Sequence, residues 1–141
     1  MDTPSPCFIC VKHARLSDYT GPILAEADGL MLTHFPIQNG VPATQGHLLI
    51  EPRRHITDLG DLTEAEARTL GTMISQGSRL IREKLGAEHV YVFRINDLVP
   101  HLHFHLVPRY PGTPREVWGP KIMEWAGAPK VTLEEVRTLR F

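Results

Sequence analysis

The sequence HLHFHLV at residues 101–107 places three histidines, His101, His103 and His105, at alternate positions. Successive side chains of a β-strand point to opposite faces, so a strand here would put the three imidazoles on one face and the intervening apolar residues in a core. Neighbouring imidazoles repel one another when protonated, which lowers their pKa values and keeps at least one neutral and nucleophilic near pH 7. A solvated polar face is the alternative, but the pattern favours an active site.

A second group of reactive side chains lies near the start of the chain, in Cys7-Phe8-Ile9-Cys10. This spacing suits a metal site or a redox disulfide. A redox pair belongs at a helix N-terminus after a strand, and nothing upstream of Cys7 could form that strand. A tetrahedral zinc site needs two further ligands, which neutral histidines can supply. The spacing therefore favours zinc, with a redox pair or inert thiols as the alternatives.

Composition limits the class of protein. A chain of 141 residues is long enough for one domain with a core and too short for two ordinary ones. The net charge of −1 and the lack of a basic stripe argue against a nucleic-acid partner. We find no secretory-signal pattern and no apolar stretch of membrane-spanning length. Two cysteines form no disulfide framework, so we expect a cytoplasmic protein. Because the sequence has no stretch of membrane-spanning length, we expect no membrane partner.

The elements that must position the histidines follow from local patterns. Residues 29–35, 47–51 and 88–95 are β-rich and bounded by turn signals, whereas 36–45 is typical of a loop. The clearest helix begins at the capping box Thr63–Glu66, has apolar residues at helical spacing and ends at Gly86.

Strand 88–95 is close enough to the histidine strand to pair with it as an antiparallel hairpin. After Tyr110 the chain is rich in Pro and Gly and contains Trp118 and Trp125, and residues 132–139 are expected to form a final short helix. We predict one helix-covered antiparallel sheet in a single domain over residues 1–141, with a core at 7–110 and a C-terminal tail at 111–141.

Taken together, these motifs resemble the histidine triad (HIT) family. Its signature is His-φ-His-φ-His-φ-φ, where φ is apolar, and residues 101–107 match it at every position. The Cys-x-x-Cys, the segment GHLLIEP at 46–52 followed by His55, and the long helix add to the resemblance, which covers most of residues 7–110.

The resemblance implies a HIT-like α+β fold, with an antiparallel sheet, one long helix, a short C-terminal helix and assembly as a homodimer. It also implies nucleotidyl transfer or hydrolysis at the α-phosphorus of a small-molecule nucleotide, such as a nucleoside phosphoramidate or a dinucleoside polyphosphate. By position in the motif, His103 is the nucleophile that forms a nucleotidylated intermediate, and His105 donates to a phosphate oxygen. Both are expected catalytic residues.

Zinc-bearing relatives complete a Cys2His2 site with the histidine after a Pro-x-x-His segment and the first histidine of the motif. The corresponding metal ligands here are Cys7, Cys10, His55 and His101. Such a closed four-ligand zinc site is structural. It would also orient the residue two places from the nucleophile. The alternative is that His55 is an ordinary surface histidine.

One departure from the family concerns the segment just before the motif. Many relatives carry there a Gly-rich loop with a Gly-Gln pair and a Ser or Thr that holds phosphates, whereas this chain has Asn96-Asp97-Leu98-Val99-Pro100. We expect Asn96 and main-chain amides to replace this loop, and Asp97 to turn away from the anion or bind an arginine. His34, at the end of the first ligand-lining strand, is the other expected nucleotide contact.

Two other hypotheses remain. The altered loop favours a non-catalytic nucleotide-binding protein of the same fold. A catalytic metal bound by all three motif histidines is also chemically reasonable, but it would leave Cys7 and Cys10 without partners.

Overall fold

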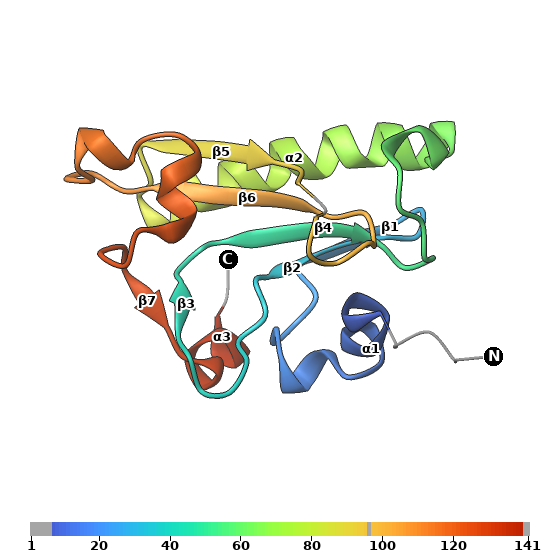
Figure 1. Ribbon diagram of the computed structural model, residues 1–141, viewed down its shortest axis with the longest axis horizontal. Helices are drawn as coiled ribbons and strands as arrows, with labels where there is room; N and C mark the ends of the chain where they lie inside the picture. Colours follow the sequence, from blue (N-terminus) through green and yellow to red (C-terminus); the bar gives the residue numbers. More distant parts are fainter. Residues whose placement is uncertain (1–6, 96, 140–141) are drawn as a thin grey trace.

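The structure is a computed structural model, which describes residues 7–95 and 97–139. Its main sheet has five strands in the order β1-β2-β4-β6-β5, and every neighbouring pair is antiparallel (Figure 1). The strands are β1 (Ala25–Ala27), β2 (Leu30–His34), β4 (Leu48–Pro52), β5 (His89–Phe93) and β6 (Phe104–Arg109), with β3 (Ala43–Thr44) and β7 (Lys130–Val131) forming a second, two-stranded sheet. The helices are α1 (Phe8–Ala14), α2 (Glu64–Leu85) and α3 (Leu133–Thr138), and the 3-10 turns are η1 (Leu16–Asp18), η2 (Leu59–Asp61), η3 (Arg115–Val117) and η4 (Pro120–Glu124).

The long helix α2 begins and ends as its sequence predicts. The Thr63 hydroxyl accepts from the Glu66 amide and the Glu66 carboxylate accepts from the Thr63 amide, while Gly86 ends the helix in the left-handed region at φ +78°. Gly77 is buried where α2 meets the sheet, and an added Cβ would lie 2.5 Å from Leu106 Cδ1. Glycine therefore allows this close approach.

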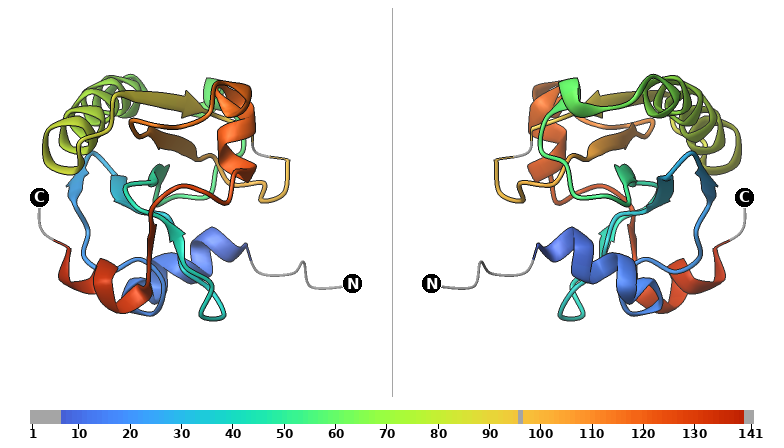
Figure 2. Two further views of the ribbon diagram at one scale, coloured as in Figure 1. Left: turned by 90° about the vertical axis from the view of Figure 1, so that its left-hand side faces the viewer. Right: turned by 90° about the vertical axis from the view of Figure 1, so that its right-hand side faces the viewer.

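Alternation along β4 and β6 separates the core from the opposite face of the sheet. The side chains of Leu48, Ile50, Phe104 and Leu106 join those of α2 in the main core. The residues between them, including Leu49 and His105, point to the face on which α1 lies. Figure 2 shows α2 at the top of the molecule and α1 and α3 at the bottom. One face of the sheet is thus packed against a helix and the other is available to build a site.

The α+β fold predicted for the HIT family is confirmed, with the antiparallel sheet, the long helix and the short C-terminal helix in place. The predicted hairpin of β5 and β6 is also present, and it pairs Phe93 with His105. The histidine strand, however, begins only at Phe104. His101 and His103 precede it in a bent segment, where the Leu102 amide donates to the Ile56 carbonyl rather than to a strand.

Several short elements lack a sequence signal. Helix α1 has no side-chain N-cap, β1 is a three-residue edge strand paired with β2, and β3 and β7 contain two residues each. The loop predicted at 36–45 therefore contains β3. Within the described residues, no helix has both the length and the apolar character needed to cross a membrane.

Candidate active site and metal centre

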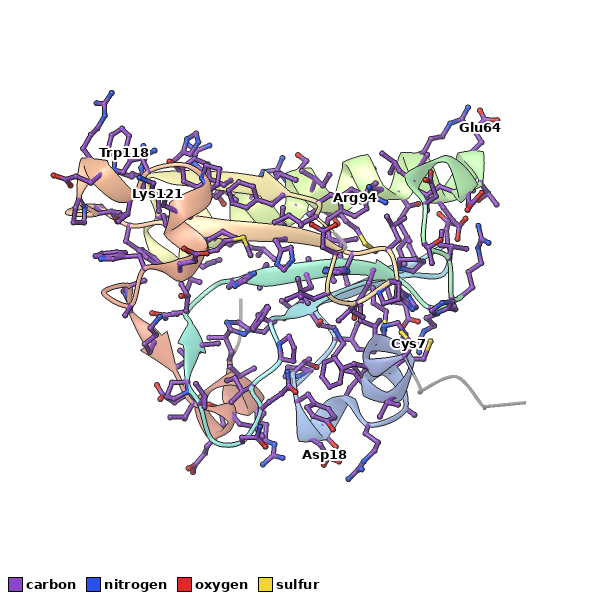
Figure 3. The ribbon with its side chains drawn as sticks, viewed as in Figure 1. Cys7, Asp18, Glu64, Arg94, Trp118 and Lys121 are labelled. Atoms are coloured by element: carbon purple, nitrogen blue, oxygen red, sulfur yellow. The ribbon has the colours of Figure 1, made fainter. Side chains whose placement is uncertain are left out.

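Four sulfur and nitrogen ligands converge where α1 meets the segment before β6. The side chains of Cys7, Cys10, His55 and His101 place one ligand atom each within 4.8 Å of one another. Cys7, labelled in Figure 3, lies just before α1, and its Sγ is 3.5 Å from His101 Nδ1. Cys10 Sγ lies 3.5 Å from His101 Nδ1 and 3.6 Å from His55 Nδ1. All four residues predicted as metal ligands are brought together.

These distances fit a tetrahedral zinc ion. Zinc bonded to sulfur at about 2.3 Å and to nitrogen at about 2.0–2.1 Å separates the two ligands by about 3.6 Å at the tetrahedral angle. His101 Nε2 is 2.7 Å from the Pro52 carbonyl oxygen, which can only accept, so the proton is on Nε2 and Nδ1 presents its lone pair to the two sulfurs. A carbonyl acceptor of this kind is the usual partner of a metal-bound imidazole.

The other two motif histidines lie apart from this cluster. His103 Nδ1 is 2.7 Å from the main-chain carbonyl oxygen of His101, so this nitrogen carries the proton and donates. The lone pair of the His103 ring is consequently on Nε2. The rings of His103 and His105 lie edge to face with their centroids 5.1 Å apart. The three histidines therefore occupy two different environments, and a single metal bound by all three is not the arrangement that the described residues form.

His47, directly before β4, is a further histidine of the site and was missed by the sequence analysis. Its Nε2 lies 2.9 Å from His105 Nδ1, and its ring stacks on Phe35 with the centroids 4.3 Å apart. Burial, followed by the neighbouring imidazole of His103, lowers the pKa of His105 to about 4. Burial also lowers the pKa of His47 well below its usual range, so both imidazoles are neutral at pH 7.

A buried ion pair connects α1 to β4 between the two histidine environments. Lys12 Nζ is 2.5 Å from Glu51 Oε1, and both side chains are 0% exposed. His13 Nε2 lies 2.9 Å from the same carboxylate oxygen, and its ring meets that of His101 edge to face. Burial alone would raise the pKa of Glu51, but the hydrogen bond from His13 and the charge of Lys12 hold that pKa below its usual range. Glu51 is therefore an ionised anchor for α1.

A cavity of about 370 Å³ opens beside His103 and His105, and we call it the first lobe. Its walls come from α1, the end of β2 and the segment before β6, and most of them are apolar. The lining residues are Phe8, Ile9, Lys12, Phe35, Pro36, Gln38, Leu49, Ile95, Asp97, Leu98, Val99, His103, His105 and Met123. An apolar cavity that ends at two histidines has the character of a small-molecule site.

The two residues predicted to contact nucleotide have different positions. Asn96 lies outside the described residues. His34 is 1% exposed, its Nδ1 donates to the Phe35 carbonyl and its Nε2 accepts from the Gly46 amide. Both ring nitrogens thus form hydrogen bonds with main-chain groups, and His34 does not line the first lobe. Its contact with nucleotide stays a prediction. Asp97 is exposed and borders the first lobe.

Comparisons with known proteins agree with this arrangement. Residues 34–112, more than half of the chain, match the family described as HIT domain. The protein belongs to the HIT family. The Mycobacterium tuberculosis protein named AP-4-A phosphorylase is 29% identical over 102 residues, which cover 64% of this chain and 52% of that protein. The Dictyostelium discoideum bis(5'-adenosyl)-triphosphatase is 29% identical over 100 residues, which cover 64% of this chain and 66% of that protein.

Among solved structures, a histidine triad protein from Bradyrhizobium japonicum is 28% identical, with a TM-score of 0.56 over 76% of this chain and 78% of that one. The matched region of this HIT protein spans roughly half to two thirds of the length of these two curated relatives.

The buried ion pair of this HIT protein gives a stability prediction. Glu51→Gln removes the carboxylate charge and leaves the Lys12 ammonium buried without its counter-ion, so we expect a loss of about 3–5 kcal/mol in the free energy of unfolding, measured by urea denaturation. Glu64→Gln is the matched control, because Glu64 pairs with Arg68 on the exposed face of α2. Equal stability of the two variants would contradict the role of Glu51.

The low pKa of His105 gives a pH prediction. Its folded value of about 4 lies below the unfolded value of 6.5, so the unfolded chain binds more protons between these pH values. The contribution of His105 to the free energy of unfolding is fully present above about pH 6.5, and it falls by roughly 3 kcal/mol as the pH drops to 4. When the free energy of unfolding is measured by urea denaturation at several pH values in this window, the loss between pH 6.5 and 4 should be smaller in His105→Gln than in the wild type by about that amount. Parallel curves for the variant and the wild type would refute the assignment.

Proposed function

We propose that this protein is a hydrolase or nucleotidyltransferase that acts at the α-phosphorus of a dinucleoside polyphosphate or a nucleoside phosphoramidate through a nucleotidylated His103. The observation that carries this proposal is the hydrogen bond from His103 Nδ1 to the His101 carbonyl, beside a cavity of ligand size. The names of the matched relatives, AP-4-A phosphorylase and bis(5'-adenosyl)-triphosphatase, support a dinucleoside polyphosphate as substrate.

The first chemical step follows from the tautomer of His103. Its Nε2 lone pair attacks the α-phosphorus, a P–N bond forms, and the P–O bond to the leaving nucleotide breaks with its electron pair on oxygen. The imidazole becomes positively charged, and the hydrogen bond from Nδ1–H to the His101 carbonyl strengthens as that charge develops. A contact that is stronger in the transition state than in the ground state accelerates the reaction.

The second step regenerates the histidine. Water attacks the phosphorus, the P–N bond breaks with its electrons returning to Nε2, and the proton of water passes to solvent. His105 is placed to assist at the phosphate oxygens, because its ring contacts that of His103 and borders the same cavity. An acceptor hydroxyl in place of water would give transfer in place of hydrolysis.

We further propose that zinc binds the Cys7, Cys10, His55 and His101 cluster, whose distances fit a tetrahedral ion. Zinc with four protein ligands would have no open coordination position, so its role would be structural. These residues connect α1, the segment after β4 and the segment before β6. The single domain, the homodimer and the cytoplasmic location stay predictions.

The role of His103 is tested by His103→Ala. Because the variant has no nucleophile, hydrolysis of a dinucleoside tetraphosphate should fall at least about 10³-fold, measured as release of mononucleotide. The thermal midpoint and the zinc content of the purified protein should match the wild type. Turnover near the wild-type rate would refute the mechanism. Nucleotide binding without turnover in the wild type would instead favour the non-catalytic alternative.

The matched variant for the metal is Cys10→Ala. It removes one ligand of the proposed centre, so zinc measured by mass spectrometry should fall from about one ion per chain to well below one. Retention of zinc by this variant, or its loss from His103→Ala, would contradict the assignment of the ligands.

A further inference from the structure

The cavity beside the motif histidines continues into a second space, which we call the second lobe. It has a volume of about 460 Å³ and shares Phe35, Pro36, Gln38 and Met123 with the first lobe. His47 lines the second lobe and His105 the first, and the 2.9 Å contact between these rings lies at their junction. The two lobes are therefore parts of one cleft, with the histidines where they meet.

We propose that the second lobe binds the leaving half of a dinucleoside polyphosphate, with Lys130 as the ligand of its phosphate groups. This inference rests on the proposed function and adds to it a subsite and a substrate class, because a substrate with two nucleotide halves would fill both lobes. A nucleoside phosphoramidate with a small leaving group would fill only the first.

The chemical character of the two lobes differs in the way this assignment needs. The first lobe is walled largely by apolar and aromatic side chains, which suit the faces of a nucleobase. The second contains the exposed cation Lys130 and several polar side chains, and none of the described residues that line it is acidic. The lysine of the first lobe, Lys12, is instead buried and paired with Glu51. These polar side chains are Gln38, Asn39, Thr44, His47 and Lys130. Such a lining fits an anionic group that accepts hydrogen bonds.

Lys130 is held on a defined backbone while its side chain stays accessible. It belongs to β7, where it pairs with Thr44 of β3, and its Nζ donates to Thr44 Oγ1 at 3.3 Å. The residue is exposed, so its ammonium can exchange this weak contact for a phosphate oxygen. Burial, then the imidazoles of His105 and His34, and then Lys130 lower the pKa of His47. The field of Lys130 therefore reaches the junction of the lobes.

The reaction itself creates the charge that Lys130 would stabilise. When His103 Nε2 bonds to the α-phosphorus, the electron pair of the breaking P–O bond remains on the oxygen of the leaving nucleotide. That product gains one negative charge at the junction of the lobes. A cation in the second lobe lowers the energy of this developing charge, whereas departure of ammonia from a phosphoramidate produces no such anion there.

The test compares two substrates in Lys130→Met, which keeps much of the side-chain stem and removes the charge. For a dinucleoside tetraphosphate we expect kcat/KM to fall about tenfold, and for adenosine 5'-phosphoramidate to stay within about twofold of the wild type. Lys130→Arg should restore most of the loss. Lys121→Met is the matched control, because Lys121, labelled in Figure 3, lies on η4 and lines neither lobe. An equal loss on both substrates, or none on the tetraphosphate, would overturn the inference.

A binding measurement separates this inference from the proposed function. In the His103→Ala background, calorimetry should show that the tetraphosphate binds at least about tenfold more tightly than AMP, and that adding Lys130→Met removes this difference. Failure of the wild type to turn over either substrate would refute the proposed function, and the calorimetry would still decide the inference. Unchanged tetraphosphate affinity in the Lys130→Met protein would overturn it.

Discussion

The end of β4 carries two adjacent contacts on which the geometry of the site depends. Glu51 binds Lys12 and His13 of α1, and the next residue, Pro52, accepts the hydrogen bond of His101. Helix α1 is only seven residues long and has few buried side chains, so its own packing anchors it weakly. The buried carboxylate therefore positions Cys7, at the N-cap of α1, and Cys10, within α1, next to His101, and it also positions the α1 residues that line the first lobe.

Side chains along β4 alternate between the core, which they stabilise, and the opposite face, where they border the site. Leu48 and Ile50 face α2 in the main core, whereas Leu49 borders the first lobe and Glu51 faces α1. A pair of buried charges is tolerated here because the two charges are opposite in sign and in direct contact, at a cost in desolvation that an apolar pair would not incur. Leu49 and His105 thus lie on a rigid, packed sheet, whereas the proposed nucleophile His103 lies directly before β6 and its ring is oriented by the hydrogen bond from Nδ1 to the His101 carbonyl.

The elements with strong local signals were predictable. The capping box at Thr63 and the left-handed Gly86 mark α2 at both ends, and the positions of β2, β4 and β5 follow from their β-rich segments. The histidine pattern indicated the site, but its extent as a strand was wrong, because Leu102 pairs with Ile56 instead of with β4. A period-two pattern specifies which face a side chain takes and does not specify where the ladder begins.

Contacts between residues that are far apart in the sequence could not be predicted from local sequence patterns. Lys12 and Glu51 are 39 positions apart, and nothing local distinguishes a lysine that will be buried from one on a surface. The grouping of Cys7, Cys10, His55 and His101 was available only through family resemblance, which the distances now support. His47 had a signal that was overlooked, since it is a polar residue that leads into an apolar strand on the face opposite the core.

The central claim is that His103 forms a covalent bond to phosphorus, and the most direct measurement is identification of that adduct. The protein would be mixed with a dinucleoside tetraphosphate, quenched in alkaline denaturant within the first turnovers and digested with trypsin for mass spectrometry. Our account predicts a nucleoside monophosphate increment on the peptide of residues 95–109, located at His103 by fragmentation and absent from His103→Ala. Turnover with no adduct under rapid quenching, or an adduct on another residue, would contradict it.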